Sequence, residues 1–140
     1  MIDEYFTVLD TRLKLGQGLA DKTYDTLRLD PDGNLLRENY VVLFSPTLDE
    51  GEVERYMKEP DADDAIPFEV EVRVVGTAVP NVRKMLSVAV GQFRGFRVGI
   101  EGRSPVMLRC VGVTQVRPDT AVKPFLYWAS TSFAWTSRKG

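Results

Sequence analysis

The sequence FEVEVRV, residues 68–74, alternates strictly between apolar and charged side chains. Successive side chains of a β-strand point to opposite faces, so this alternation predicts a half-buried strand. Its four apolar residues face a core, and Glu69, Glu71 and Arg73 face away from it. A sheet with one apolar face needs other elements to cover that face, so the next question is which parts of the chain can do this.

Two helices are predicted from apolar residues at helical spacing. The first covers residues 3–15, with Asp3 as its N-cap and Gly16 as its end. The second begins at Pro80, because proline suits the first turn of a helix, and it ends near Phe93. The apolar stripes are Ile2, Tyr5, Phe6, Leu9 and Leu13 in the first helix and Val82, Met85, Leu86, Ala89 and Phe93 in the second.

Further strands are predicted on both sides of the second helix. The apolar run at residues 40–44 suits a strand covered on both faces, and a turn at residues 30–34 precedes it. Three more strands are expected at residues 96–100, 107–116 and 125–135, separated by turns at 102–105 and 117–120. The predicted fold is α+β, a mainly antiparallel sheet with two helices packed against it, in one domain that covers residues 1–140.

Residues 47–67 are predicted to form a mobile, solvated loop that is strongly acidic. The run at residues 61–64 lacks the glycine and the terminal glutamate of a calcium-binding loop, which argues against a metal site. A mobile acidic loop of this kind could dock on a partner. The candidate docking residues are Asp49, Glu50, Glu52, Glu54, Asp61, Asp63 and Asp64.

The composition argues against several classes of function. The 140 residues include no histidine and one cysteine, Cys110, which excludes Ser-His and Cys-His nucleophile systems, an internal disulfide and a cysteine-cluster zinc site. Cys110 lies in an apolar run, so we expect a buried, inert thiol. No nucleotide-binding motif, membrane-length apolar run or signal peptide is found, so we expect no cofactor, no metal, no membrane and a protein made in the cytosol.

Charge is divided unevenly along the chain. Residues 1–71 hold 18 acidic and 7 basic side chains, whereas residues 72–140 hold 2 acidic and 11 basic ones. Either the fold mixes the two sets in space, or the subunit is dipolar and its acidic and basic surfaces meet on neighbouring copies or layers of an assembly.

The last predicted strand carries bulky residues on both faces. One face can serve the core, and the other needs a cover from a helix of the same chain or from a neighbouring subunit. We favour a neighbouring subunit, because aromatic residues are enriched where subunits meet. The candidate interface residues are Phe125, Tyr127, Trp128, Phe133 and Trp135, together with Arg73.

Few residues are candidates for chemistry or for contact with nucleic acid. Glu69 and Glu71 share one strand face, roughly 7 Å apart, which could position a pair of carboxylates, but Arg73 beside them favours a charge-balanced surface. Basic residues near turns of the second half could meet phosphates, namely Arg94, Arg97, Arg103, Arg117 and Lys123. No stacking aromatics are interleaved with them and the chain is acidic overall, so sequence-specific reading of nucleic acid is not expected.

Several segments together resemble the tail terminator proteins of long-tailed, siphovirus-type bacteriophages of actinobacteria. The resemblance lies in the order of elements and covers most of the chain, whereas the acidic segment from Thr47 to Asp64 departs from it. The matching pieces are residues 40–44, residues 72–76, the helix that begins at Pro80, and residues 98–103, 116–119 and 124–128.

The resemblance implies a structural protein of the virion, made in the host cytoplasm, and not an enzyme. It would form a ring, expected to be hexameric, that caps the head-proximal end of the tail tube and joins it to the head connector. Its partners would be further copies of itself, the tail tube protein and a connector or stopper protein. DNA would cross the ring without being read, and Arg94, Arg97, Arg103 and Arg117 would face this channel or the connector.

Two other hypotheses stay open. Another neck or tail-tube subunit would share the size and the α+β content, and a tube subunit would polymerise into long tubes. A small carboxylate-dependent enzyme or ligand-binding domain would use Glu69, Glu71 or the acidic loop.

Overall fold

The computed structural model describes residues 1–48 and 65–140, and a seven-stranded sheet forms its centre. The two long strands β4 and β9 lie side by side, antiparallel, along 11 consecutive residue pairs. Strands β2 and β3 pair with the other side of β4, and β7 and β8 pair with the other side of β9. The bounds are β1 Thr23–Tyr24, β2 Tyr40–Leu43, β3 Thr47–Leu48, β4 Ile66–Gly76, β7 Arg109–Val113, β8 Arg117–Asp119 and β9 Leu126–Ser137.

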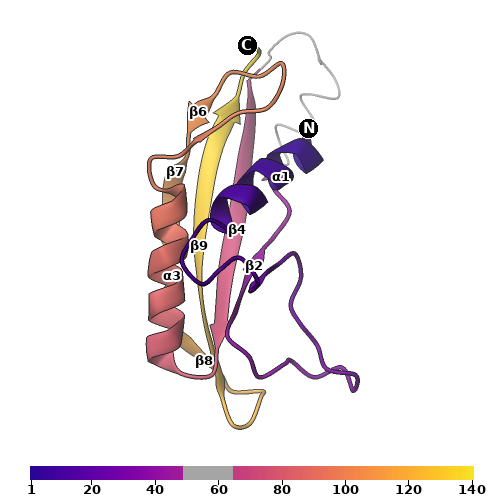
Figure 1. Cartoon of the computed structure of the whole chain (residues 1–140), viewed down its shortest axis with the longest axis vertical. Coiled ribbons are helices and arrows are strands. Elements are labelled where there is room, and N and C mark those ends of the chain that lie inside the picture. The colour runs from indigo at the N-terminus through magenta and orange to yellow at the C-terminus, as the bar shows by residue number, and fades with distance from the viewer. Residues whose placement is uncertain (49–64) are drawn as a thin grey trace.

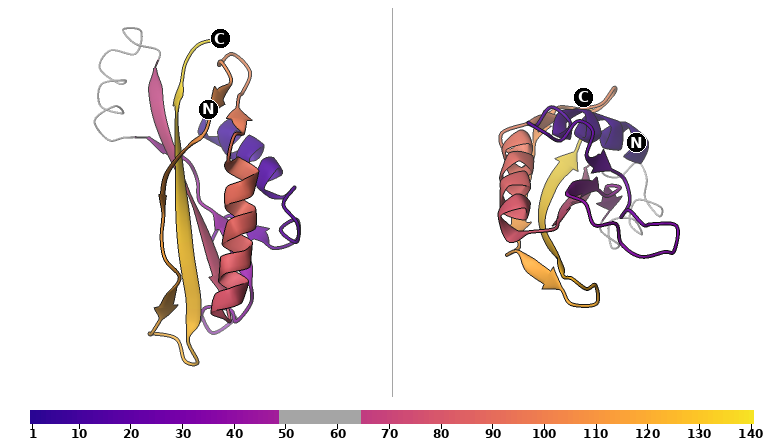
Figure 2. Two further views of the ribbon diagram at one scale, coloured as in Figure 1. Left: turned by 90° about the vertical axis from the view of Figure 1, so that its left-hand side faces the viewer. Right: turned by 60° about the horizontal axis from the view of Figure 1, so that its bottom comes forward.

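Two helices of the described chain, α1 (Ile2–Leu13) and α3 (Val79–Phe93), lie on the same face of this sheet (Figures 1 and 2). A small separate sheet of β5 (Arg97–Val98) and β6 (Val106–Met107) follows α3. All strand pairs are antiparallel except β1 with β2. The predicted α+β fold, a mainly antiparallel sheet with helices packed on it, is confirmed.

The alternation at residues 68–74 sets the position of the core. Its four apolar residues are buried under the helices, and the predicted stripes of both helices pack onto them. The ring of Phe68 stacks on Trp135 at 5.4 Å, and Tyr5 of α1 contacts both rings at about 5 Å. Burying a large apolar side chain contributes about 1.5–3 kcal/mol, so this cluster provides much of the drive for folding.

A second, smaller cluster covers part of the opposite face of the sheet. It contains Tyr40, Val42, Val75 and Leu126, all buried. Its cover is the segment of the same chain that leads from β1 to β2 and that adds Leu27 and Leu35 among others. The favoured expectation that a neighbouring subunit covers this face at Leu126 is thereby corrected.

Within that segment, residues 28–36 form a small hairpin, called the hairpin arm below (Figure 1). The Asp30 carboxylate accepts hydrogen bonds from the backbone N–H groups of Asp32 and Asn34, at 2.9 and 3.0 Å. Gly33 has a φ of 86°, which favours glycine. The predicted turn at residues 30–34 is confirmed, and its chemistry is that of an aspartate-capped turn.

Helix α1 differs from its prediction at both ends. It begins at Ile2 with Met1 as N-cap, and no side chain caps it, so Asp3 is a residue of the first turn and not the cap. An acidic residue there still interacts favourably with the helix dipole. The helix ends at Leu13, three residues before Gly16, because the chain turns tightly toward α3 at that point.

Several strand boundaries also differ from the prediction. Residues 107–116 do not form one strand: the chain leaves β6 at Leu108, which is buried and whose N–H donates to the Phe96 carbonyl, and enters the large sheet as β7. Residues 117–119, predicted as a turn, form β8, where Pro118 is tolerated because the strand lies at the sheet edge. Residues 47–48 and 66–67, predicted as loop, belong to β3 and β4.

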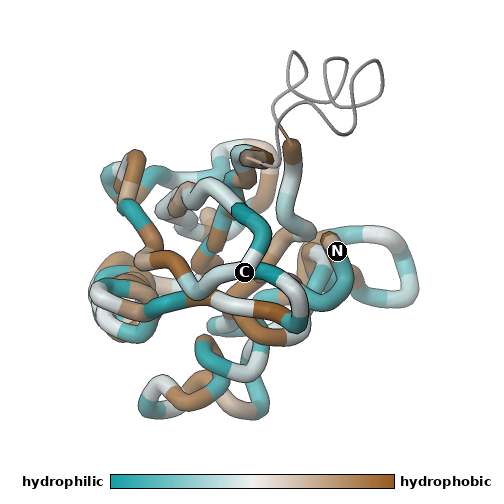
Figure 3. The backbone as a smooth tube through the Cα atoms, turned by 90° about the horizontal axis from the view of Figure 1, so that it is seen from above, coloured by the Kyte–Doolittle hydropathy of each residue, from teal (hydrophilic) through white to brown (hydrophobic). Residues whose placement is uncertain are grey.

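Hydrophobic and hydrophilic residues are interspersed along the whole described trace (Figure 3). No helix of residues 1–48 and 65–140 combines the length and the apolar character that a membrane crossing requires.

Candidate assembly surface

Strand β7 is an open edge of the large sheet. It pairs with β9 on one side, and no strand of the described residues pairs with its other side. All five of its residues are exposed, and the register shifts around Val111 in a bulge. An open edge presents unpaired backbone donors and acceptors, so it is a place where another chain can bind.

An open groove of about 450 Å³ runs between this edge and α3. Leu86 and Val90 of α3 and Val113 of β7 form its apolar part, and Arg83 and Arg94 lie along it with Ser87 and Gly91. Val113 is 54% exposed although its side chain is apolar. The volume is enough for several side chains of a partner.

The surface around the groove is basic, and its positive charges have no ion-pair partner among the described residues. Helix α3 contains Arg83 and Lys84 but no acidic residue. None of the ion pairs found among the described residues involves these two side chains, Arg94 or Arg109. This surface therefore combines apolar contact area with positive charge that has no ion-pair partner within residues 1–48 and 65–140.

The four arginines predicted to face a channel do not form one cluster. Arg94 and Arg97 are exposed near the end of α3. Arg103 donates through Nε to Ser137 Oγ at 2.7 Å, at the last residue of β9, whereas Arg117 lies opposite Trp128 near the first. At about 3.4 Å per residue, these two positions are about 30 Å apart along the strand.

The predicted interface aromatics divide into two groups. Phe133 and Trp135 are only 1% and 3% exposed and pack in the subunit's own core, which corrects their assignment to an interface. Phe125 is 39% exposed and precedes β9, and Tyr127 and Trp128 are half-buried on opposite faces of it. These three keep surface for a partner, so their role stays a prediction.

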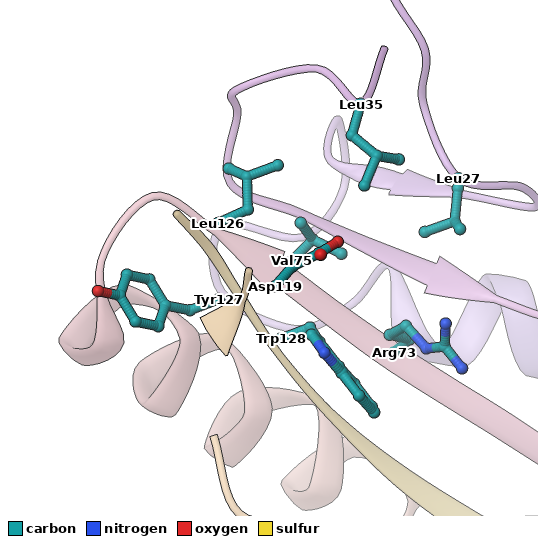
Figure 4. A pocket seen from close by; sticks show the side chains of 8 residues that line it. All are labelled: Leu27, Leu35, Arg73, Val75, Asp119, Leu126, Tyr127 and Trp128. Atoms are coloured by element: carbon teal, nitrogen blue, oxygen red, sulfur yellow. The ribbon is translucent and has the colours of Figure 1, made fainter. Parts of the chain in front are cut away.

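Arg73, the remaining predicted interface residue, is held by its own subunit. Its guanidinium donates to Glu71 Oε2 at 2.9 and 3.1 Å and lies over the rings of Phe44 and Trp128, at 5.3 and 4.9 Å from their centres. Figure 4 shows the small pocket beside it, which Val75 and Asp119 also line. Its volume of about 80 Å³ is well below that of ordinary ligand sites, so a single side chain is the most it can take.

The other candidates for chemistry do not converge. Glu71 accepts hydrogen bonds from Arg73, and Glu69, two residues earlier on the same strand, is exposed. Within residues 1–48 and 65–140, no group of three or more acidic or cysteine side chains is close enough to hold a metal ion. The acidic candidates Asp49, Glu50, Glu52, Glu54, Asp61, Asp63 and Asp64 lie outside the described residues, so their docking role stays a prediction.

Neither the groove nor the exposed edge position of β7 was predicted from the sequence, and Cys110 illustrates the reason. Cys110 was predicted to be buried, but it is exposed on β7. The run around it is as apolar as a core strand, and only the sheet order places it at an edge. Gly112 was the available signal, because a glycine inside a strand often marks a bulge, and the register of β7 shifts between Cys110 and Gly112.

The comparisons with known proteins give one structural likeness. No family model matches the chain, and no curated protein is similar to it. A chain from the structure of the virion of a native gene transfer agent particle has a similar fold, with a TM-score of 0.59 over 96% of this chain and 94% of that one. The two sequences are 14% identical, so the likeness establishes a shared fold.

Proposed function

We propose that this chain is a tail terminator of a long-tailed bacteriophage or a related particle. It forms a ring, expected to be hexameric, at the head-proximal end of the tail tube and joins the tube to the head connector. The observation that carries the proposal is the likeness of fold, along almost the full length of both chains, to a chain of a gene transfer agent virion. A virion component acts through contacts with its neighbours.

The surface of the subunit supports a ring. A closed ring with head-to-tail contacts needs two different patches on every subunit. The basic groove beside β7 supplies one, since Val113 and part of Leu86 and Val90 stay open there, and Arg83 and Arg94 have no ion-pair partner among the described residues. Arg97 and Arg117, both exposed and outside the groove lining, suit loose contacts with phosphates of passing DNA or with the connector.

Electron microscopy of the protein mixed with its tail tube tests this proposal. Negative-stain images of the protein alone, of tail tubes alone and of the mixture are compared, and mass photometry gives the subunit number. We expect a ring of about six subunits at one end of each tube, and shorter tubes when the protein is present during tube assembly.

Two outcomes would contradict the proposal. Growth of the protein by itself into long tubes would identify a tube subunit instead. A protein that stays monomeric in the presence of tubes would have no ring-forming role. A matched control is the Leu15→Ala variant, which changes an exposed side chain outside the α3–β7 groove and should leave ring formation intact.

A further inference from the structure

The hairpin arm carries the chemical complement of the groove. Its residue Leu29 is 56% exposed although it is apolar, and its tip contains Asp30 and Asp32. Five backbone and side-chain hydrogen bonds of 2.8–3.0 Å fix the arm, among them Leu36 N–H to the Arg28 carbonyl. The arm thus presents a leucine beside negative charge on a preformed support.

The groove also presents apolar area, but beside positive charge. Leu86, Val90 and Val113 leave apolar area open, and Arg83 and Arg94 beside them have no ion-pair partner in the described part of the chain. An exposed leucine followed by aspartates at the tip is the kind of projection that such a groove can take, because apolar burial and opposite charge then act together.

One subunit cannot bring its own arm and groove together. Helix α3 and β7 lie at one edge of the sheet, and the hairpin arm projects beyond the opposite edge, in Figure 1 and in the right-hand view of Figure 2. The sheet order separates them, since β7 is one end of it and β1 and β2 are the other. A patch and its complement on opposite edges make a head-to-tail contact between copies.

We infer that the hairpin arm of one copy docks in the α3–β7 groove of the next copy. Leu29 packs against Leu86, Val90 and Val113 of the neighbour, and Asp30 and Asp32 face its Arg83 and Arg94. Repetition of this contact around a rotation axis closes a ring. The inference rests on the proposed self-assembly, and it names the two surfaces that make the contact.

Disulfide cross-linking between copies tests this pairing. In a Cys110→Ser background, Asp32→Cys marks the tip of the arm and Ser87→Cys marks the groove, and both positions are exposed. The doubly substituted protein is oxidised with and without tail tubes and analysed on a non-reducing gel. We expect a ladder of covalent oligomers that ends at the ring, whereas each single-cysteine protein gives dimers at most.

Ring formation is scored in the same samples by mass photometry, so that two failures can be told apart. Rings without the ladder would overturn the arm-in-groove contact while the proposed function stands. Neither rings nor ladder in the presence of tubes would overturn both. Cross-links from groove to groove instead of arm to groove would also contradict the inference.

A second pair of variants tests the energetics without cysteines. Leu29→Ser should weaken self-association at least about tenfold, because a leucine that is buried in the contact is removed. The matched control is Leu15→Ser, since Leu15 is 67% exposed and lies outside arm and groove. Both variants are checked for unchanged thermal unfolding of the monomer; equal self-association of the two would reject the contact.

A third test exchanges the charges of one groove residue and one arm residue. Arg83→Glu in the groove and Asp32→Arg in the arm should each reduce ring formation, and the double variant should recover most of the loss. Additive losses in the double variant would show that the two side chains do not face each other.

Discussion

At Gly16 the chain passes so close to α3 that a side chain would collide. A Cβ atom there would lie 2.8 Å from Val88 Cγ1 and 2.9 Å from Leu19 Cδ1. We expect Gly16→Ala to destabilise the protein by about 1–3 kcal/mol, because the packed helix must shift to make room. Urea unfolding followed by circular dichroism measures the change.

Gly91 provides the matched control for Gly16. It lies inside α3, and a Cβ atom added there meets nothing within 4 Å. Gly91→Ala should raise the free energy of unfolding by up to about 1 kcal/mol, because alanine favours the helix. A similar decrease in the free energy of unfolding for both substitutions would contradict the close approach of Gly16 to α3.

Tyr40 should make stability depend on alkaline pH. Its side chain is fully buried, its hydroxyl oxygen accepts a bond from the Arg28 N–H at 3.4 Å, and burial raises the pKa of the phenol above its ordinary value of 10.0. The contribution to stability is complete below the pKa of the unfolded chain and is lost as the pH rises through the higher pKa of the folded state.

The measurement for Tyr40 is a comparison of unfolding free energies at about pH 9 and about pH 11. We expect a steeper fall for the unsubstituted protein than for Tyr40→Phe. The difference in absorbance at the tyrosinate wavelength between the two proteins should have its midpoint above pH 10. Parallel pH profiles would contradict a buried phenol.

At the scale of elements, local pattern and sheet order decide different things. The alternation at Val70 and Val72 and the apolar run that starts at Tyr40 are local, so the sequence sufficed to predict β4 and β2 with their burial. The break at Leu108 and the exposure of Cys110 depend on which strands become neighbours. That information is distributed over the whole chain and cannot be read from a short window.

The candidate surface, too, was predictable only where local composition decides, and not where sheet order decides. The basic character of residues 72–140 was evident from composition, but the groove needs Leu86 of α3 and Val113 of β7 side by side. Conversely, Phe133 and Trp135 were predicted to lie in an interface, yet α3 and α1 of the same chain cover them. Aromatic content alone did not distinguish core from interface.

Hydrogen exchange should separate the strands by their position in the sheet. Amides of β4 are flanked by strands on both sides and by helices, so they should exchange only on global unfolding. Amides of β7 that face away from β9 should exchange orders of magnitude faster in the isolated subunit. Equal protection of β7 and β4 would contradict an open edge.

At the scale of the whole molecule, the separation of charge predicts a response to salt. Raising the ionic strength from about 0.1 M to about 1 M shortens the screening length from about 10 Å to about 3 Å. We expect the ring fraction, measured by mass photometry, to fall several-fold over this range. The variant with Arg83→Gln and Arg94→Gln should form fewer rings at low salt and show a weaker dependence.

A ring fraction that does not change with salt would show that the contact between copies is mainly apolar. A fraction that rises with salt would contradict charge complementarity between arm and groove, because screening would then relieve repulsion.

The ladder between β4 and β9 has a mechanical consequence. Its 11 residue pairs extend over about 37 Å in one direction, and their hydrogen bonds lie across that direction. A pull along the strands would load all these bonds in shear at the same time, whereas a pull across them would open the bonds one after another. The subunit should therefore be stiffest along its long axis and transmit a load from one end to the other with little stretching.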